Sequence, residues 1–544
     1  MSRDLEADLR MLQQVLSLAQ ARDIDGAATL AERALDEGFE HPLLLNVVAT
    51  RHEQQGRLEE ALRLLERGTE IAPEDIPVRN ALALCLQRLD RPADALVHVE
   101  EILRREPGLP FAHASRGNAL MALGLLGQAR ESHLRAVELD PHSVVALAAL
   151  ASISTHRGEH ADARRWAERT LALVPGYPDA VLALASADLA GGRRAEAETA
   201  LRALIADPRA GILDRSRAEG LLGDVLDAAG RHGEAFAAYS TCNEGQRRVY
   251  ARYGAMGSVA EYAESLGAAL EAVAGRWQPR IPQAVTHLVR EHVFLVGFPR
   301  SGTTLLEVVL DGHPDVVSLE EHELLSEGVL QYMREPLDLG RLADAPESDL
   351  ALLRQAYWDG VARGGAAVKG KVFIDKHPLN TLKLPLIARL FPDAKVLFAC
   401  RDPRDVVLSC FRRRFKMNPA MYQMLTLDGA ARFYAATMRV ADLSRLLLGL
   451  AWREVRYEQV MADFSGEMRT LCDFLGIRWT DDMGAFAARV QRREHSTPST
   501  AQLARGLDRS GLGHWRHYAE ALAATQATLE PWVQRFGAAG ADPA

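Results

Sequence analysis

Small apolar residues recur at a fixed interval along the first half of the chain. Alanines stand 34 residues apart at Ala27, Ala61, Ala95, Ala129, Ala163 and Ala197, and prolines keep the same step at Pro73, Pro107, Pro141 and Pro175. A second set of small residues precedes these alanines from Ala61 onward: Ala49, Ala83, Gly117, Ala151 and Ala185. Between the two sets lies a turn residue, at Gly56, Asp90, Gly124, Gly158 and Gly192. The pattern predicts two closely crossing antiparallel helices per unit, with a proline after the second helix because proline cannot continue it.

A different pattern begins near residue 292. Four apolar residues, from Val293 to Val296, run into Gly297, and an amphipathic stretch follows at 305–310. This order predicts a buried strand, a glycine-bearing loop and a helix. Such a loop turns successive backbone N–H groups toward the positive end of the helix, so we expect it to bind a phosphate or a similar oxyanion.

Three further strands are predicted in the second half. Residues 372–384 and 395–410 each predict a strand that ends in a polar loop or turn before a helix, and residues 452–458 predict a strand before a helix that ends near Gly476. The stretch 251–274 is helical in pattern, and two prolines at 277–282 indicate a linker. We therefore predict repeat helices at 1–245, a helical linker at 246–284 and an α/β domain with a mainly parallel sheet at 285–544.

Composition narrows the class of protein. A length of 544 residues predicts two or three domains, and 48% hydrophobic with 25% charged residues is typical of a globular protein. The net charge of −9 gives no support to a general nucleic-acid binder. Five scattered cysteines fit neither a zinc site nor a disulfide framework, and no apolar run approaches the roughly 18 residues that span a membrane. We expect a cytoplasmic protein.

The 34-residue period resembles the tetratricopeptide (TPR) repeat, over roughly residues 9–245. The resemblance implies an α-helical solenoid whose concave face holds a peptide or a protein partner. The alternative is that the repeats pack against the second half or mediate self-association.

The spacing Gly297-x4-Gly302 followed by Thr303-Thr304 is similar to a Walker A loop in which threonine replaces the lysine. That lysine reaches the β- and γ-phosphates in ATPases, so its absence argues against ordinary nucleotide hydrolysis. Residues 299–304, Pro-Arg-Ser-Gly-Thr-Thr, instead resemble the 5′-phosphosulfate loop of sulfotransferases that use PAPS, 3′-phosphoadenosine 5′-phosphosulfate. Arg401 and Ser409, eight residues apart after an apolar strand, resemble the 3′-phosphate element of the same family.

The resemblance implies a set of cofactor-binding residues: Arg300, Ser301, Gly302, Thr303 and Thr304 at the phosphosulfate, Arg401 and Ser409 at the 3′-phosphate, and Tyr457 beside the nucleotide. In the closing segment it implies Ser499 or Thr500, together with Arg505. A guanidinium suits a phosphate because it donates two parallel hydrogen bonds.

Three residues are implied as catalytic. In the tyrosylprotein branch of the family, a carboxylate about twenty residues beyond the loop arginine is the general base, and that position falls on Glu321. Glu320, His322 and Glu323 are rivals for the role. Lys376 matches the lysine that contacts the transferred group, and with Arg300 it would stabilise the charge that develops on the leaving oxygen.

The resemblance implies transfer of a sulfuryl group from PAPS to a hydroxyl acceptor, leaving PAP, with no metal. Protein tyrosine is the favoured acceptor, a glycan or a small molecule remains an alternative, and we expect specificity in loops such as 333–365. Two other functions stay open: a TPR adaptor with a catalytically inactive PAP-binding domain, and a P-loop kinase. The missing Walker lysine and the lack of an obvious Mg²⁺ constellation argue against the kinase.

Overall fold

The computed structural model describes residues 5–277, 288–334, 339–492, 503 and 506–537. Its contacts divide the chain into two units, between Ala187 and Asp188. The division falls inside a helix of the repeat region, so the last repeat helices belong to the same unit as the parallel sheet.

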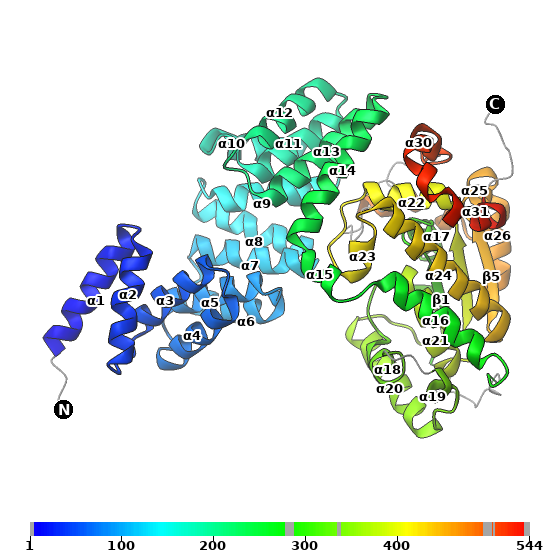
Figure 1. Ribbon diagram of the computed structural model, residues 1–544, viewed down its shortest axis with the longest axis horizontal. Coiled ribbons are helices and arrows are strands. Elements are labelled where there is room, and N and C mark those ends of the chain that lie inside the picture. The colour runs from blue at the N-terminus through cyan, green and yellow to red at the C-terminus, as the bar shows by residue number, and fades with distance from the viewer. Residues whose placement is uncertain (1–4, 278–287, 335–338, 493–502, 504–505, 538–544) are drawn as a thin grey trace. The chain divides into compact units, whose positions relative to one another are not determined.

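The repeat region consists of helices joined by short turns (Figure 1). They are α1 Leu5–Gln20, α2 Ile24–Asp36, α3 Pro42–Gln54, α4 Leu58–Ile71, α5 Ile76–Arg88, α6 Pro92–Arg105, α7 Pro110–Ala122, α8 Leu126–Leu139, α9 Val144–His156, α10 His160–Leu173, α11 Pro178–Ala190, α12 Arg194–Ala206, α13 Ile212–Ala228 and α14 His232–Val249. Successive helices pack on one another from α1 to α10 and again from α12 to α14. The predicted helical repeat is confirmed.

The small residues and the turn residues play the predicted parts. Every alanine of the 34-residue series is fully buried, as are Ala83, Ala151 and Ala185 of the second series. All of the turn residues have positive φ, from 58° at Asp90 to 79° at Gly124. The left-handed conformation ends one helix and starts the next, which explains glycine at most of these positions.

Five parallel strands form the sheet of the second unit within the described ranges, in the order β2-β3-β1-β4-β5. The strands are β1 Glu291–Gly297, β2 Val316–Glu320, β3 Val372–Lys376, β4 Lys395–Cys400 and β5 Ala451–Arg456. Every strand pair with a described register is parallel, and β1 lies between β3 and β4. The loops that follow these strands therefore meet at one edge of the sheet, where ligands bind in open α/β folds.

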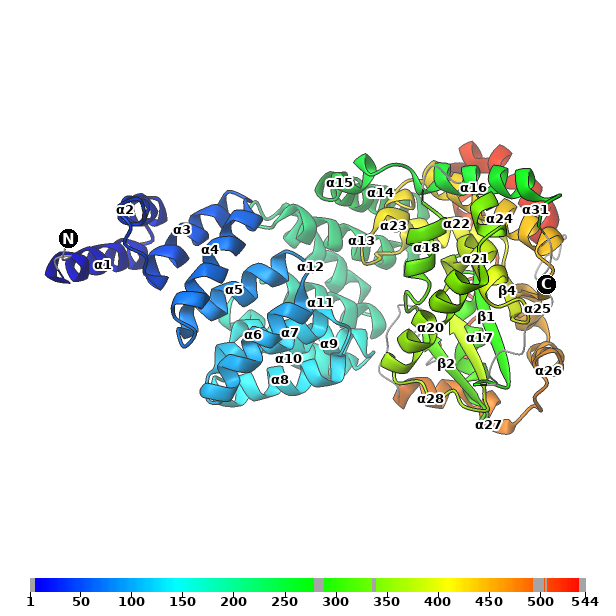
Figure 2. The ribbon, with the colours of Figure 1, turned by 90° about the horizontal axis from the view of Figure 1, so that it is seen from below.

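Most of the remaining helices cover this sheet, whereas α15 lies beside α14 and α23 (Figure 2). They are α15 Ala251–Ala255, α16 Val259–Val273, α17 Thr303–Leu310, α18 Ser326–Tyr332, α19 Leu339–Ala343, α20 Glu347–Arg363, η1 Pro378–Lys383, α21 Leu384–Leu390, α22 Pro403–Arg412, α23 Pro419–Gln423, α24 Leu427–Leu447, α25 Tyr457–Ala462, α26 Phe464–Leu475, α27 Asp481–Gly484, α28 Phe486–Arg492, η2 His514–Tyr518, α30 Ala519–Leu522, η3 Ala523–Thr525 and α31 Gln526–Phe536. The stretch 333–365, expected as loop, thus contains two helices, α19 and α20.

The two faces of the sheet have separate cores. Val293 and Leu295 of β1 pack with α17, α26 and α28, whereas Phe294 and Val296 pack with α16, α20, α21 and α24. The alternation follows from the two-residue period of a strand, and both faces are apolar because helices cover both.

The helix α16 lies inside the predicted linker and packs into the second of these cores. Ala263, Leu266 and Leu270 are buried there, and the Tyr262 hydroxyl donates to the Met333 carbonyl at 3.0 Å. The predicted boundaries at 245 and 284 stay a prediction, since they follow the repeat register and not the packing. Prolines 279 and 282 lie outside the described residues.

No helix in the described ranges is long and apolar enough to cross a membrane. The five cysteines are all buried and none forms a disulfide.

Candidate active site

The loop between β1 and α17 is held in a strained shape. Gly302 is the N-cap of α17 with φ 101°, and a Cβ placed there would lie 2.8 Å from Cδ2 of Tyr457. Arg300 has φ 71°, a left-handed conformation that is rare for a residue with a side chain. The loop is fixed at its start by Thr381, whose hydroxyl accepts from Gly297 N–H at 3.0 Å. Backbone strain of this kind persists where the surroundings impose it, often at ligand sites.

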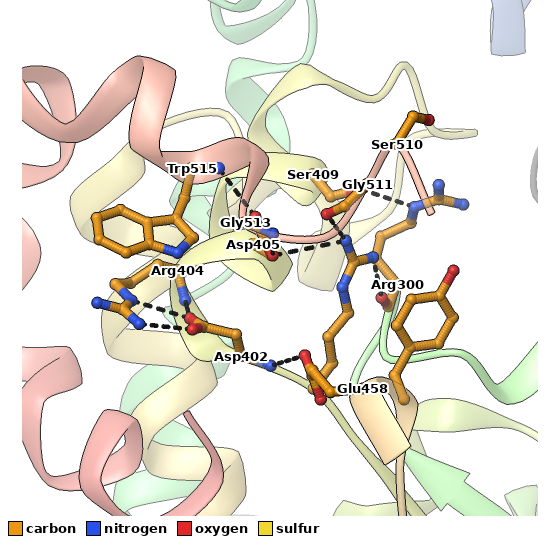
Figure 3. A network of polar contacts seen from close by, with 12 residues as sticks. Arg300, Asp402, Arg404, Asp405, Ser409, Glu458, Ser510, Gly511, Gly513 and Trp515 are labelled. Atoms are coloured by element: carbon orange, nitrogen blue, oxygen red, sulfur yellow. Dashed lines mark hydrogen bonds and ion pairs between the residues drawn. The ribbon is translucent and has the colours of Figure 1, made fainter. Parts of the chain in front are cut away.

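The predicted phosphosulfate loop and the predicted 3′-phosphate element are in direct contact. Arg300 Nε donates to the Ser409 hydroxyl at 3.0 Å, and Arg401 Nη1 donates to the Arg300 carbonyl at 3.4 Å. The Arg401 guanidinium lies 4.7 Å from the centre of the Tyr457 ring. These four residues thus form one group (Figure 3), although the first and the last, Arg300 and Tyr457, stand more than 150 positions apart in the sequence.

The electrostatics of this group favour an anionic ligand. Loss of water contact, then the adjacent charge of Arg413, lower the pKa of Arg300 well below its ordinary value. Arg401 Nε is buried and has no hydrogen-bond partner among the described residues. Crowded guanidiniums and an unused buried donor are stabilised by an anion that accepts from them, so these residues fit a phosphate.

A C-terminal segment lies against this group (Figure 3). Arg401 donates to the Gly511 carbonyl, and the Tyr457 hydroxyl donates to the Asp508 carbonyl at 3.4 Å. Asp405 of α22 accepts from the N–H groups of Gly513 and Trp515, at 2.7 and 2.9 Å.

Trp515 is a packing residue here, because the Arg404 guanidinium stacks on its ring at 3.7 Å. Ser301, Thr303 and Thr304 are buried in the loop and the first turn of α17. The predicted ligands Ser499, Thr500 and Arg505 lie outside the described residues.

Lys376, at the end of β3, is surrounded by three carboxylates. Its Nζ lies 2.8 Å from Glu320, 2.9 Å from Glu321 and 3.4 Å from Glu307, and its side chain is fully buried. Burial disfavours the ammonium, but the charges of Glu307, Glu320 and Glu321 outweigh it and raise the pKa of Lys376. The lysine is therefore a permanent cation at neutral pH.

Glu321 differs from the other two carboxylates. Its side chain is 43% exposed, against 23% for Glu320 and 3% for Glu307. Its φ is 53°, and its N–H donates to the Lys376 carbonyl at 2.7 Å. Glu321 and Arg300 are the two non-glycine residues of the second unit, where described, with positive φ. Two of the three predicted catalytic residues, Arg300 and Glu321, therefore have a strained backbone conformation.

The rival Glu323 is tied to other cations. It pairs with His377 at 3.2 Å and with Lys383. The hydrogen bond from His377, followed by the charge of Lys383, lowers the pKa of Glu323 to about 2. A carboxylate of such low basicity is a poor general base at neutral pH.

The opposite face of β3 carries a separate buried polar chain. Asp375 accepts from the Tyr357 hydroxyl at 2.9 Å and from Asn380 at 3.3 Å, and the His292 ring lies 2.8 Å from the same hydroxyl. Burial raises the pKa of Asp375 to about 6. Because successive strand residues point to opposite faces, this chain is separated from Lys376 by the sheet.

Two residues near the site were not predicted as ligands or catalysts. Glu307 reaches Lys376 from α17, and the signal for it is a single carboxylate in an otherwise apolar and buried helix. The charge of Arg413 lowers the pKa of Arg300. In the sequence, Arg413 was only one member of a basic run at 412–416, which was expected either to line the cofactor pocket or to be solvated. No group of His, Cys, Asp and Glu in the described part of the chain is arranged to hold a metal ion.

Comparisons with known proteins match the two halves of the chain to different families. Residues 292–481 match the sulfotransferase family, and tetratricopeptide-repeat families match residues 52–123 and, separately, 12–76, 115–178 and 182–241. An uncharacterised protein of Aquifex aeolicus (strain VF5) is 27% identical over 43% of this chain and 31% of its own length, so the match covers less than two thirds of that relative. Protein-tyrosine sulfotransferase 2 of Gallus gallus is 25% identical over 45% of this chain and 68% of its own length.

Among solved structures, a thermophilic TPR protein of Thermus thermophilus aligns with a TM-score of 0.31 and 22% identity, over 33% of this chain and 98% of that one. Taken with the parallel sheet and the loop after β1, the family matches identify residues 292–481 as a sulfotransferase family domain that follows a series of tetratricopeptide repeats.

Proposed function

We propose that the chain is a sulfotransferase that transfers a sulfuryl group from PAPS to a hydroxyl acceptor. One observation carries the proposal: Arg300 of the loop after β1 contacts both residues of the second element, since its Nε donates to Ser409 at 3.0 Å and its carbonyl accepts from Arg401 at 3.4 Å. Two anion-binding elements in contact suit a nucleotide with phosphates at both its 5′ and 3′ positions. ATP has no 3′-phosphate for the second element.

The donor, when bound, supplies an activated sulfuryl group at its 5′ end. In this proposal Arg300, Ser301, Gly302, Thr303 and Thr304 hold that end. The backbone N–H groups of Gly302, Thr303 and Thr304 lie at the start of α17, where the helix provides no intrahelical partner.

At the other end Arg401 and Ser409 hold the 3′-phosphate, and Tyr457 lies beside the nucleotide. The buried Nε of Arg401 provides a donor for the phosphate, since it has no partner in the described residues. Arg413 adds positive charge to the same group, because its charge acts on Arg300.

Glu321 is our proposed general base. It is the most exposed of the three carboxylates around Lys376, so an acceptor hydroxyl can reach it. Removal of the acceptor proton in the transition state is typically worth a factor of about 10² to 10⁴. Lys376 and Arg300 would stabilise charge on the leaving oxygen, because both are fixed cations at the carboxyl edge of the sheet.

We further propose that the acceptor is a tyrosine of a protein, recruited by the repeats. Two findings support this: the names of the protein-tyrosine sulfotransferases that the chain resembles, and repeats of a class that commonly binds peptides. A cytoplasmic location stays a prediction.

The donor proposal is tested by thermal shift with PAP and with ATP as the matched control. PAP should stabilise the second unit, by about 2.7 kcal/mol at a hundredfold excess over its dissociation constant. ATP should stabilise it much less, because it lacks the 3′-phosphate. Equal shifts from both ligands would reject PAPS as the donor.

The base is tested by Glu321→Gln, with the exposed Glu327→Gln of α18 as its control. Glu321→Gln should bind PAP within about twofold of the wild type and lose turnover of a tyrosine-containing peptide by about 10²-fold or more. Normal turnover in Glu321→Gln together with loss in Glu320→Gln would move the role to Glu320.

A further inference from the structure

Three consecutive arginines follow the proposed 3′-phosphate element. Arg412 ends α22, three residues after Ser409, and Arg413 has an extended backbone with φ −93° and ψ 135°. The helix therefore ends within this run of arginines.

Arg412 and Arg414 contact the helices α13 and α14. Arg412 Nη2 lies 2.6 Å from Asp227, and Arg414 Nη2 lies 2.7 Å from Asp224, one helical turn earlier on α13. The Arg412 guanidinium also stacks on the Tyr239 ring of α14 at 5.0 Å. Arg413 stands between these two arginines in the chain, and its charge lowers the pKa of Arg300 while Asp224 acts on Arg413 itself.

The same helix pair holds the backbone at the start of this segment. Asn243 of α14 donates to the Phe411 carbonyl at 2.9 Å, a carbonyl near the C-terminus of α22. The rings of Phe236 and Phe411 stack at 5.5 Å. The end of α22 is thus fixed by a polar bond, an aromatic contact and two ion pairs.

Asp227 is also bound from the C-terminal segment. His514 Nε2 donates to it at 3.1 Å, the Tyr518 hydroxyl donates to the same oxygen, and His232 of α14 lies 3.2 Å away. This segment is the one whose Gly511 carbonyl accepts from Arg401. Burial opposes the ionised form of Asp227, but the bond from His514 and the charge of Arg412 prevail and keep its pKa below the ordinary value.

We propose that the last helix pair of the repeat region, α13 and α14, is a positioning element of the nucleotide site. Asp224 and Asp227 hold Arg412, Arg414 and the C-terminal segment, and thereby hold the end of α22 with Ser409 and the Gly511 carbonyl that accepts from Arg401, so that Ser409 and Arg401 face the 3′-phosphate. The two aspartates are positioning residues, since they touch other side chains and not the nucleotide. The inference rests on the proposed function, because it assumes that the site binds a 3′-phosphate.

The last repeat helices are therefore part of the structure that forms the donor site. A helix pair with the repeat signature, Gly223, Gly230 and Ala235, supplies part of the frame for the donor site. Removing the repeat region up to about residue 250 would delete α13 and α14, and with them that frame.

The test measures PAP affinity by calorimetry in the full chain, with Asp227→Asn and Asp224→Asn. Asp214→Asn is the matched control: it makes the same change on α13, at a residue that pairs with Arg217 at 3.7 Å and does not contact residues 411–414. We expect Asp227→Asn to raise the dissociation constant for PAP about tenfold, which is about 1.4 kcal/mol. Its KM for PAPS should rise in parallel, with kcat at saturating PAPS within about twofold of the wild type.

Two readouts separate positioning from simple loss of stability. AMP, which lacks the 3′-phosphate, should bind the wild type and Asp227→Asn equally. The Asp227→Asn effect on PAP should also shrink to within about twofold in a Ser409→Ala background, because coupled residues are not additive. A lowered melting temperature with unchanged PAP affinity, or full additivity with Ser409→Ala, would overturn the inference.

If Asp227→Asn does not fold, Asp224→Asn provides the test, because the Asp224 side chain is 29% exposed. Asp224→Asn should also raise the dissociation constant for PAP. Failure of the wild type to bind PAP would reject the proposed function, and this inference with it. Normal PAP binding by the wild type and by both aspartate variants would reject this inference alone.

Discussion

The buried Asp375 makes a quantitative prediction about pH. Its side chain is 1% exposed, and burial raises its pKa from 3.8 to about 6 despite the hydrogen bond from Tyr357. Between these two pKa values the folded chain binds the proton more tightly than the unfolded chain. The free energy of unfolding therefore falls as pH rises through this window.

The size of the effect follows from the two pKa values. At pH 4.5 ionisation of Asp375 lowers the free energy of unfolding by about 1 kcal/mol, and at pH 7.5 by about 3 kcal/mol. Asp375→Asn keeps the shape of the side chain and removes the titration. The difference in stability between the variant and the wild type should therefore shift in favour of the variant by about 2 kcal/mol from pH 4.5 to pH 7.5.

The assay is urea unfolding at the two pH values, followed through the transition that PAP shifts. Asp393→Asn, an exposed residue before β4, is the control and should show no such pH-dependent gain. A difference between Asp375→Asn and the wild type that stays constant across the range would refute a raised pKa at Asp375. PAP affinity should be unchanged, because Asp375 lies on the face of β3 away from Lys376.

Two further predictions concern the loop and the lysine cluster. Gly302→Ala places a Cβ at a φ of 101° and 2.8 Å from the Tyr457 ring, so it should cost about 1–2 kcal/mol of stability and weaken PAP binding in calorimetry. Gly365→Ala, at φ 74° with open space around it, should lose stability without losing PAP affinity, and equal PAP losses would contradict the role of the Tyr457 contact. Glu307→Gln removes one of the charges around Lys376, and we expect a stability loss of about 1–3 kcal/mol with at least tenfold slower turnover and unchanged PAP binding. Turnover equal to that of Glu327→Gln would show that Glu307 does not support Lys376.

The repeat region was predictable from sequence almost in full. The alanine and turn positions recur every 34 residues, and each unit contacts its neighbours in the chain, so the pattern contains both the helices and their partners. Asp90 shows how far this extends: it occupies a glycine position of the pattern and has the positive φ of the glycines. Local spacing was sufficient because the contacts are local.

The strands β1, β3, β4 and β5 and their loops were predictable for a similar reason, whereas β2 was not predicted. Each apolar run ends in polar residues, and parallel strands bring such ends to one edge, so the convergence of Arg300, Arg401 and Ser409 could be expected before the contacts were seen. The family resemblance supplied the roles of these residues. It did not include Glu307, because one carboxylate in an apolar helix has no local partner to indicate its purpose.

The sequence by itself determined the repeat period, the strand–loop–helix order and the residues at the carboxyl edge of the sheet. Only the tertiary structure decided which of them meet. The strand order puts β3 between β2 and β1, which brings Glu320 and Glu321 to Lys376, and packing brings Asp224 and Asp227 to arginines more than 180 residues later. The physical reason is that hydrophobic periodicity specifies which face of an element is buried, whereas its partner across a long chain separation depends on how all the faces pack together.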